Sequence, residues 1–201
     1  MKTKSALATA VVCVLAAATT GASAQESSAK TLSPGGHDLV ELLTGFAKRT
    51  GRQIVIDPRV RAQVPLAGIE PRDITHEQML VILDVHQFAM VETAGVLSVV
   101  PDANARQLPT PVFDTAGFKA MDFELVTLLV QPKNICVNML VPVLRPLQPQ
   151  AAHLAADLQS NTLIINDRAV NARRIAELVT QLDKRGPGKK DCMPAPSKPA
   201  G

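Results

Sequence analysis

Two short periodic segments separated by an aperiodic stretch constrain the fold of this chain more than any other feature. Residues 37–101 and 122–184 show regular apolar spacing, whereas residues 102–121 contain Pro109, Pro111 and Gly117 without it. Such composition is typical of a linker between domains. Each periodic segment is near the lower size limit for a self-sufficient core, since short chains bury only about 60% of their surface. The sequence therefore predicts two small tandem domains that gain stability by packing on each other or on further copies.

The first segment predicts a helix, two strands, a second helix and two further strands. Apolar residues at helical spacing fill residues 39–47, and Gly51 follows as a stop. Thr75 and Gln78 have the spacing of a capping box at the start of the second helix. Pro65 indicates an edge position for its strand, because proline cannot donate to a sheet. The predicted strands are 53–56, 63–67, 88–92 and 96–100, with the last two joined by a tight turn at 93–95.

The second segment predicts the order β-α-β-β-α, so the fold class is α+β. Strands are expected at 123–130, 154–158 and 162–166, with a turn at 159–161. A helix is expected over 138–147 with Pro142 near its first turns, and Asp167 is expected to cap the last helix. KH domains use related arrangements, but they need a GXXG loop that this segment does not contain.

Both ends of the chain have the composition of segments outside a folded core. Residues 1–24 have lysines at positions 2 and 4, an apolar run over 6–18 and a small-x-small end at Ala22 and Ala24 before Gln25. This pattern predicts a secretory signal peptide cleaved after Ala24, and its apolar run is too short to span a bilayer. Residues 25–36 are predicted to be a flexible leader, and residues 185–201 a disordered tail rich in proline and lysine. We therefore expect export to the periplasm.

Two cysteines, Cys136 and Cys192, remain after the predicted cleavage. An oxidising compartment permits a disulfide between them. Cys192, however, lies in the predicted tail and need not approach Cys136, which also suits a small buried apolar position. The sequence leaves these two alternatives open.

Charge and motif content exclude several functions. The net charge of +3 falls to +1 without the two signal-peptide lysines, and the chain has no Trp or Tyr, so nucleic-acid binding is not expected. His37, His76, His86 and His153 lack the spacing of metal ligands. No nucleophile elbow, phosphate loop or dinucleotide fingerprint occurs. We therefore predict no catalytic residue, no cofactor, no metal and no small-molecule substrate, and we do not expect an enzyme.

Two longer stretches resemble the periplasmic N-domains of bacterial secretins, most closely the type II secretion branch. Residues 49–66 and 86–102 are similar to the first N-domain, although Gln87 replaces its usual glycine. Residues 140–183 are similar to the repeated N-domain that follows it. The first set of matching residues is Ile56, Asp57, Pro58, Val60, Phe88, Val91, Val100 and Pro101. The second set is Leu144, Arg145, Pro146, Leu147, Asp157, Ser160, Asn161, Leu163, Ile164, Asp167, Ile175, Leu178, Leu182 and Asp183.

This resemblance implies a protein-interaction module of a secretion or pilus system. In the family, the first N-domain contacts an inner-membrane component, and the repeated domains pack into rings of identical copies. A full secretin continues into a pore, whereas this sequence stops at Gly201. The resemblance therefore leaves open a split subunit that docks on a separate pore, a periplasmic adaptor, and a relic of a truncated secretin.

Two alternatives come from other classes. The first domain also resembles the signalling domain of TonB-dependent receptors, although the second domain is not expected there. A periplasmic small-ligand binder would need a larger pocket than domains of this size normally offer. For a docking module, the Pro65-containing run at 63–67 is one candidate edge for pairing with a partner strand.

Overall fold

The computed structural model describes residues 36–186. The predicted signal peptide with Ala22, Ala24 and Gln25, most of the predicted leader, and the tail with Cys192 lie outside the described residues. The first elements in chain order are β1 (Gly36–Asp38), α1 (Leu39–Thr50), β2 (Gln53–Ile56), β3 (Gln63–Pro65), the 3₁₀ turn η1 (Pro71–Asp73), α2 (His76–Val85), β4 (Phe88–Thr93), β5 (Val96–Pro101) and α3 (Asp102–Ala105). They are followed by β6 (Val112–Asp114), β7 (Leu125–Val130), α4 (Val137–Leu144), η2 (Arg145–Leu147), β8 (His153–Asp157), β9 (Thr162–Arg168) and α5 (Ala169–Lys184).

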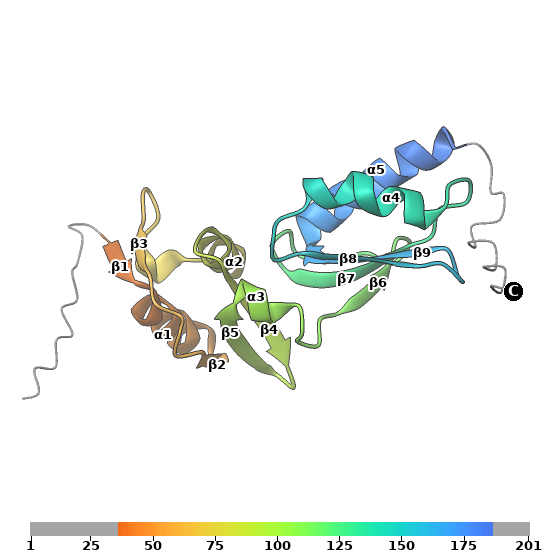
Figure 1. The fold of residues 1–201 in the computed structure, drawn as a ribbon. Coiled ribbons are helices and arrows are strands. Elements are labelled where there is room, and N and C mark those ends of the chain that lie inside the picture. Colours follow the sequence, from red (N-terminus) through yellow and green to blue (C-terminus); the bar gives the residue numbers. More distant parts are fainter. Residues whose placement is uncertain (1–35, 187–201) are drawn as a thin grey trace, which may run out of the picture. The chain divides into compact units, whose positions relative to one another are not determined.

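The first domain packs α1 and α2 with two small sheets (Figure 1). One sheet has three strands in the order β2-β5-β4, and the other pairs β1 with β3. Phe46, Leu43 and Met79 lie at the centre of the core and are at most 2% exposed. Both helices are amphipathic, and each buries its apolar face in this core.

The local stop and start signals of the first domain are confirmed. Gly51 ends α1 in the left-handed conformation with φ 68°, which costs a glycine little. Thr75 and Gln78 form the reciprocal capping box of α2. Ala94 and Gly95 both have positive φ in the β4–β5 turn, as a tight hairpin requires.

The stretch 102–121, predicted as a linker between the domains, contains two short elements that were not predicted. It contains α3 and β6, and Ala105 of α3 is 1% exposed in a small apolar cluster with Ala89, Val91 and Leu125. β1, at the border of the predicted leader, was also not predicted. Elements of three or four residues are too short for apolar periodicity to appear in the sequence.

The second domain is a four-stranded sheet in the order β6-β7-β9-β8, and α4 and α5 cover one of its faces (Figure 1). β7 and β8 both pair antiparallel with the central β9, and β6 adds a parallel edge to β7. Leu128, Leu163 and Ile165 point towards the helices and are fully buried. The predicted β-α-β-β-α order is therefore confirmed, with β6 added at its start.

Two details of the second domain differ from the sequence prediction. α4, which contains Pro142 near its first turns, ends at Leu144 and not at Leu147 as predicted, and η2 continues beyond it as a 3₁₀ turn. Asp167 does not cap α5, because β9 runs on to Arg168. The Asp167 carboxylate instead accepts hydrogen bonds from the Arg168 N–H at 2.7 Å and from the Asn171 side chain.

Candidate docking surfaces

The described residues offer several surfaces for protein contact. Within residues 36–186 no group of three or more His, Cys, Asp or Glu side chains is placed to hold a metal ion. His76 is half-buried, and burial lowers its pKa below the usual range, so it is mainly neutral at pH 7. Its ring lies 5.9 Å from that of Phe46, which makes it a packing residue of α2.

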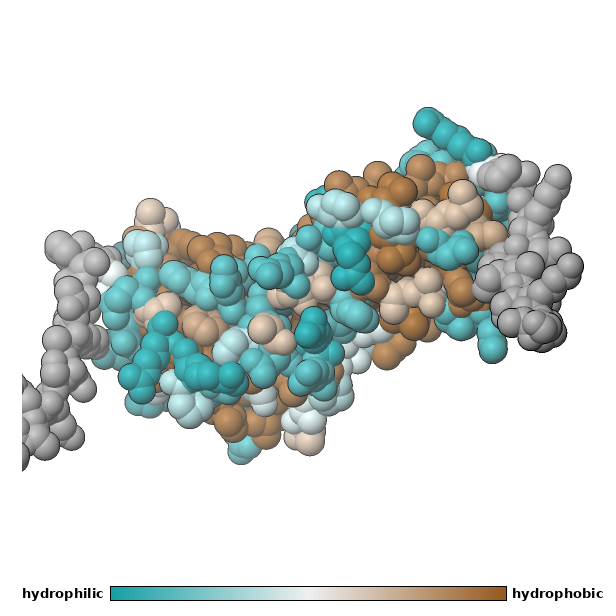
Figure 2. All heavy atoms as spheres, in the orientation of Figure 1, coloured by the Kyte–Doolittle hydropathy of each residue, from teal (hydrophilic) through white to brown (hydrophobic). Residues whose placement is uncertain are grey.

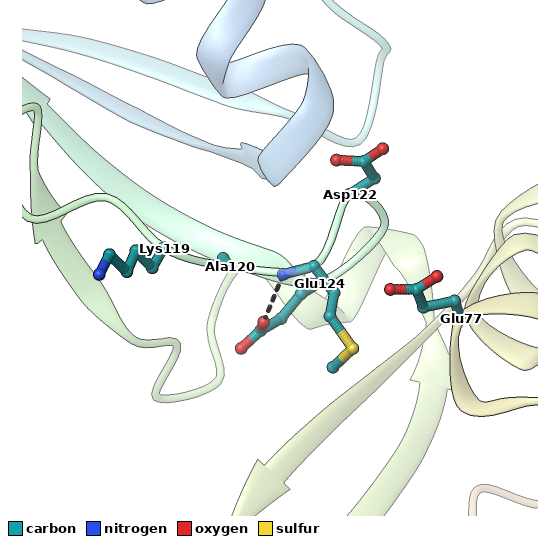
Figure 3. Close-up of a pocket in the computed structure, with 6 residues that line it drawn as sticks. Glu77, Lys119, Ala120, Asp122 and Glu124 are labelled. Carbon is teal, nitrogen blue, oxygen red and sulfur yellow. Dashed lines mark hydrogen bonds between the residues drawn. The ribbon is translucent and has the colours of Figure 1, made fainter.

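An open cavity of about 510 Å³ lies beside the loop 119–124 (Figure 3). Glu77, Asp122 and Glu124 line it, and their carboxylates do not converge on one point (Figure 3). The Glu124 carboxylate stabilises its own loop, since it accepts a hydrogen bond from the Met121 N–H at 3.1 Å. Asp122 pairs with Arg173 at 2.5 Å. These contacts explain Asp122 and Glu124 as residues that stabilise the loop.

The first candidate docking surface is the two-stranded sheet of β1 and β3, which we call the β1–β3 edge. The strands pair antiparallel with His37 opposite Val64, and no other described strand pairs with either of them. Pro65 ends β3 without an N–H to donate, which confirms the predicted edge position. Each strand therefore presents an outer row of backbone groups, and a partner strand can pair with such a row.

Side chains at this edge are closely fitted. A Cβ at Gly36 would lie 3.1 Å from the Cβ of Gln63, so an alanine there would fit only with a small shift of its neighbour. The Gln63 side-chain oxygen is buried and accepts no hydrogen bond from the described residues. Most buried acceptors in folded proteins have a donor, so this oxygen is an exception within the β1–β3 pair.

The second candidate surface is an apolar stripe on the helical layer of the second domain. Met139, Val143 and Leu147 lie four residues apart along α4 and η2, with 57%, 58% and 43% of their surfaces exposed. Val170 on α5 is also exposed at 41%. Figure 2 shows apolar residues gathered over this helical layer. We call these four residues the α4 stripe, and an apolar stripe outside the core is typical of a contact surface.

The third surface is the sheet face that α4 and α5 leave uncovered. Leu129, Ile164 and Ala155 lie side by side on β7, β9 and β8, and all three are half-buried. In the neighbouring row, Asn166 donates to the hydroxyls of Thr110 and Thr127 at 3.2 and 3.0 Å. We call this the open sheet face. It lies on the opposite side of the sheet from the α4 stripe.

Arg168, at the end of β9, joins this sheet to elements of the first domain. Its guanidinium donates to Asp84 at 2.9 Å, to Asp102 at 2.6 Å and to the Phe88 carbonyl oxygen at 3.0 Å. The Arg168 side chain is 9% exposed, so the contact is nearly desolvated. Beside it, burial raises the pKa of the Asp167 carboxyl. No sequence motif marks Arg168, because its partners lie 66–84 residues away along the chain.

Of the two predicted disulfide residues, only Cys136 is described. It precedes α4 and is disulfide-bonded, while Cys13 and Cys192 both lie outside the described residues. The pairing of Cys136 with Cys192 therefore stays a prediction. The exposed α4 stripe was not predicted, since its residues read in sequence as part of one apolar helix.

Comparison with known proteins assigns each of the two domains to a protein family. Residues 35–99 match the model of the GspD-like N0 domain, and residues 127–188 match the bacterial type II/III secretion system short domain. The chain carries the N-terminal domains of the bacterial secretin family. The secretin N-domains are non-enzymatic components of secretion systems. The two matches together do not support the alternative of a TonB-dependent signalling module.

Named secretins match over both N-domains. The secretin XcpQ of Pseudomonas aeruginosa is 32% identical over 151 residues, which cover 74% of this chain and 22% of XcpQ. The secretin ExeD of Aeromonas hydrophila is 32% identical over 164 residues, covering 78% of this chain and 24% of ExeD. The chain therefore spans about a quarter of the length of the curated relatives it matches.

A solved secretin complex has the same fold in its N-domains. The type II secretion outer-membrane complex of Klebsiella pneumoniae, with PulD, PulS and the HR domain of PulC, matches with a TM-score of 0.65 and 28% identity. The match covers 76% of this chain and 26% of that one. Within residues 36–186 no helix has the length and apolar character needed to cross a membrane.

Proposed function

We propose that this protein is a periplasmic docking module of a type II-like secretion system. The observation that carries the proposal is the N0-like domain with its β1–β3 edge, with which no further described strand pairs, followed along the chain by a secretin short domain. The Klebsiella complex supports it, because that assembly contains an HR domain of PulC together with the secretin. We infer that the partner here is the periplasmic domain of the corresponding inner-membrane component.

The β1–β3 edge gives this docking a physical basis. A partner strand that pairs with β1 or β3 gains backbone hydrogen bonds, and pockets on either side of the strand select its side chains. Because Pro65 interrupts β3, the free edge is short, which limits unspecific strand addition.

The second domain supplies lateral contacts between copies. Its α4 stripe and open sheet face lie on opposite sides of the sheet, so the stripe of one copy faces the sheet of the next in a head-to-tail arrangement. Such heterologous contacts close into a ring when the rotation between copies allows it. Each domain alone is small, so this packing also adds to the apolar surface that it buries.

Binding to the purified periplasmic domain of the inner-membrane component from the same bacterium tests the docking proposal. We expect the protein purified from the periplasm to bind, and Gln63→Pro to weaken binding by about tenfold or more, because proline removes a backbone N–H of the edge without removing a core side chain. The control is Lys184→Gln on the last turn of α5, which should leave affinity unchanged. Full affinity in the edge variant, provided that its circular dichroism is native, would reject the β1–β3 edge as the docking surface.

A further inference from the structure

A groove on α1, beside the β1–β3 edge, has no role in the fold of the first domain. It has a volume of about 600 Å³, which lies in the range of ~300–1,000 Å³ typical of binding sites. Leu42 and Gly45 of α1 form its floor, and Pro71 of η1 forms one wall. His37 of β1 lines its end, so the groove continues from the edge strand.

Gly45 points to an occupant from outside the chain. It lies in the middle of a twelve-residue helix, where glycine is less favourable than almost any other residue. A Cβ built at Gly45 would meet no heavy atom within 4 Å, so packing inside the protein does not require glycine there. Glycine at this position keeps the helix surface open, which allows a bound backbone to approach closely.

Hydrogen bonds from Arg49 of α1 hold η1, whose Pro71 lines the groove, in place. Arg49 donates to the carbonyl oxygens of Pro71 and Ile74, and its guanidinium lies 5.7 Å from the centre of the Phe46 ring. These contacts fix η1 relative to α1, so the groove exists before any partner binds. They also leave the positive charge of Arg49 facing carbonyl groups and an aromatic ring.

The charges around the groove favour an acidic occupant. Lys48 and Arg72 line it together with the single carboxylate of Glu41, while the third cation, Arg49, is held by the carbonyl groups of Pro71 and Ile74. Arg72 has Asp73 at 3.9 Å, but both side chains are more than two-thirds exposed, and such a pair contributes little. The apolar floor and cationic rim together fit an apolar side chain flanked by carboxylates.

We propose that the α1 groove binds an extended, acidic segment of the docking partner, with an apolar side chain over Leu42 and its backbone against Gly45. This inference rests on the proposed docking function and adds a second contact to it. The segment enters the groove next to the β1–β3 edge, so one partner can use both sites. Linking two weak contacts in this way raises affinity through effective concentration.

The test uses a fluorescein-labelled peptide, Asp-Asp-Leu-Ser-Leu-Asp-Asp, and its counterpart with lysines in place of the aspartates. Fluorescence anisotropy with the periplasmic protein at low ionic strength measures both affinities. We expect the acidic peptide to bind more tightly, and Gly45→Leu to weaken it by about tenfold by filling the groove. Lys48→Glu with Arg72→Glu is expected to remove the preference for the acidic peptide.

Matched variants control for changes in folding and charge. Thr180→Leu adds the same apolar side chain to an exposed site on α5, and Lys119→Glu with Lys184→Glu makes the same charge change outside the first domain. Gly45→Leu also raises helix propensity, so a higher melting temperature together with weaker binding is the expected signature. Equal affinity of wild type and Gly45→Leu for the acidic peptide, or equal binding of both peptides, would overturn the inference.

The experiments distinguish failure of the groove proposal from failure of the proposed docking function. Loss of binding to the inner-membrane domain in the β1–β3 edge variant alone, with Gly45→Leu unaffected, would retain the docking function and reject the groove. Binding to that domain that neither variant changes would reject both surfaces, whereas no binding of the wild type to it would reject the docking function itself.

Discussion

Single buried polar residues hold the second domain together, and Asn161 is the clearest example. It is 1% exposed and adopts a positive φ of 54° in the β8–β9 turn. Its side chain accepts from the Val137 N–H at 3.1 Å and donates to the carbonyls of Pro132 and Ile135 at 2.9 and 3.2 Å. One side chain therefore fixes the turn and the start of α4.

We expect Asn161→Ala to lower the free energy of unfolding by about 2–4 kcal/mol, because it leaves buried backbone groups unpaired and places alanine at positive φ. Urea unfolding followed by circular dichroism measures this, since the chain has no Trp or Tyr for fluorescence. Asn138→Ala, at an exposed position of α4, is the control and should change stability by less than about 0.5 kcal/mol. An equal effect of the two variants would show that the Asn161 contacts are not needed.

Asp183 makes the stability of the second domain depend on pH. Burial alone would raise the pKa of its carboxyl, but hydrogen bonds from the N–H groups of Lys133, Asn134 and Ile135 bring it below the usual value. A lowered folded-state pKa contributes stability above the ordinary carboxyl pKa of ~4, and this contribution is lost as the pH falls further.

We therefore expect Asp183→Asn to be less stable than the wild type at pH 7, with a difference that shrinks towards pH 3. Unfolding in urea at a series of pH values measures it. Asp114→Asn is the control variant. The Asp114 carboxylate accepts a local loop hydrogen bond from the Gly117 N–H, so we expect its replacement to change the pH dependence of stability less. A difference that stays constant between pH 7 and pH 3 would show that ionisation of Asp183 is not the cause.

At the scale of elements, what sequence can predict depends on length. The α1 stop at Gly51, the Thr75 capping box and all three strands of the β-α-β-β-α unit follow from local patterns, because each involves neighbours in sequence. β1, α3 and β6 were not predicted, since contacts with residues elsewhere in the chain stabilise them. These contacts are strand pairing for β1 and β6 and a small apolar cluster for α3. The α4 stripe was missed for a related reason: sequence shows that a residue is apolar, but not which of its faces another element covers.

The α4 stripe yields an element-scale prediction about copies of the chain. We expect Val143→Glu to reduce lateral self-association by about tenfold or more, since it places a charge in an apolar contact. The stability of the monomer should change little, because Val143 is 58% exposed. Chemical cross-linking in intact envelopes, with Thr180→Glu on α5 as control, measures this. Unchanged cross-linking in Val143→Glu would show that the lateral contact does not use the α4 stripe.

At the scale of the whole molecule, Arg168 couples the described elements over long distances in sequence. Removing its guanidinium leaves the carboxylates of Asp84 and Asp102 in a partly buried site without their cation. Breaking a buried ion pair in this way costs about 3–5 kcal/mol, and we expect the lower part of this range because Asp84 is partly exposed.

We therefore expect Arg168→Met to be destabilised and to unfold in two steps, whereas the wild type unfolds in one. Arg168→Lys should be intermediate, since it keeps the charge but loses the forked geometry. Circular dichroism in increasing urea records the transitions. A single, unshifted transition in Arg168→Met would show that this contact does not couple the elements that it joins.

The pairing predicted for Cys136 also acts at this scale, since it would attach the C-terminal tail to the start of α4. Non-reducing peptide mapping by mass spectrometry of the periplasmic protein is expected to find Cys136 linked to Cys192. A Cys192→Ser variant should then lose the linked peptide and become less stable by about 2–4 kcal/mol at most. Detection of Cys136 as a reduced thiol in the native protein would contradict this pairing.

The most direct test of the central claim is affinity capture of this protein from gently cross-linked cell envelopes, followed by mass spectrometry. The docking account predicts recovery of the inner-membrane component of a type II-like secretion system, and reduced recovery in the Gln63→Pro variant. Recovery of the same proteins by the wild type and the edge variant, or the absence of any secretion component, would contradict it.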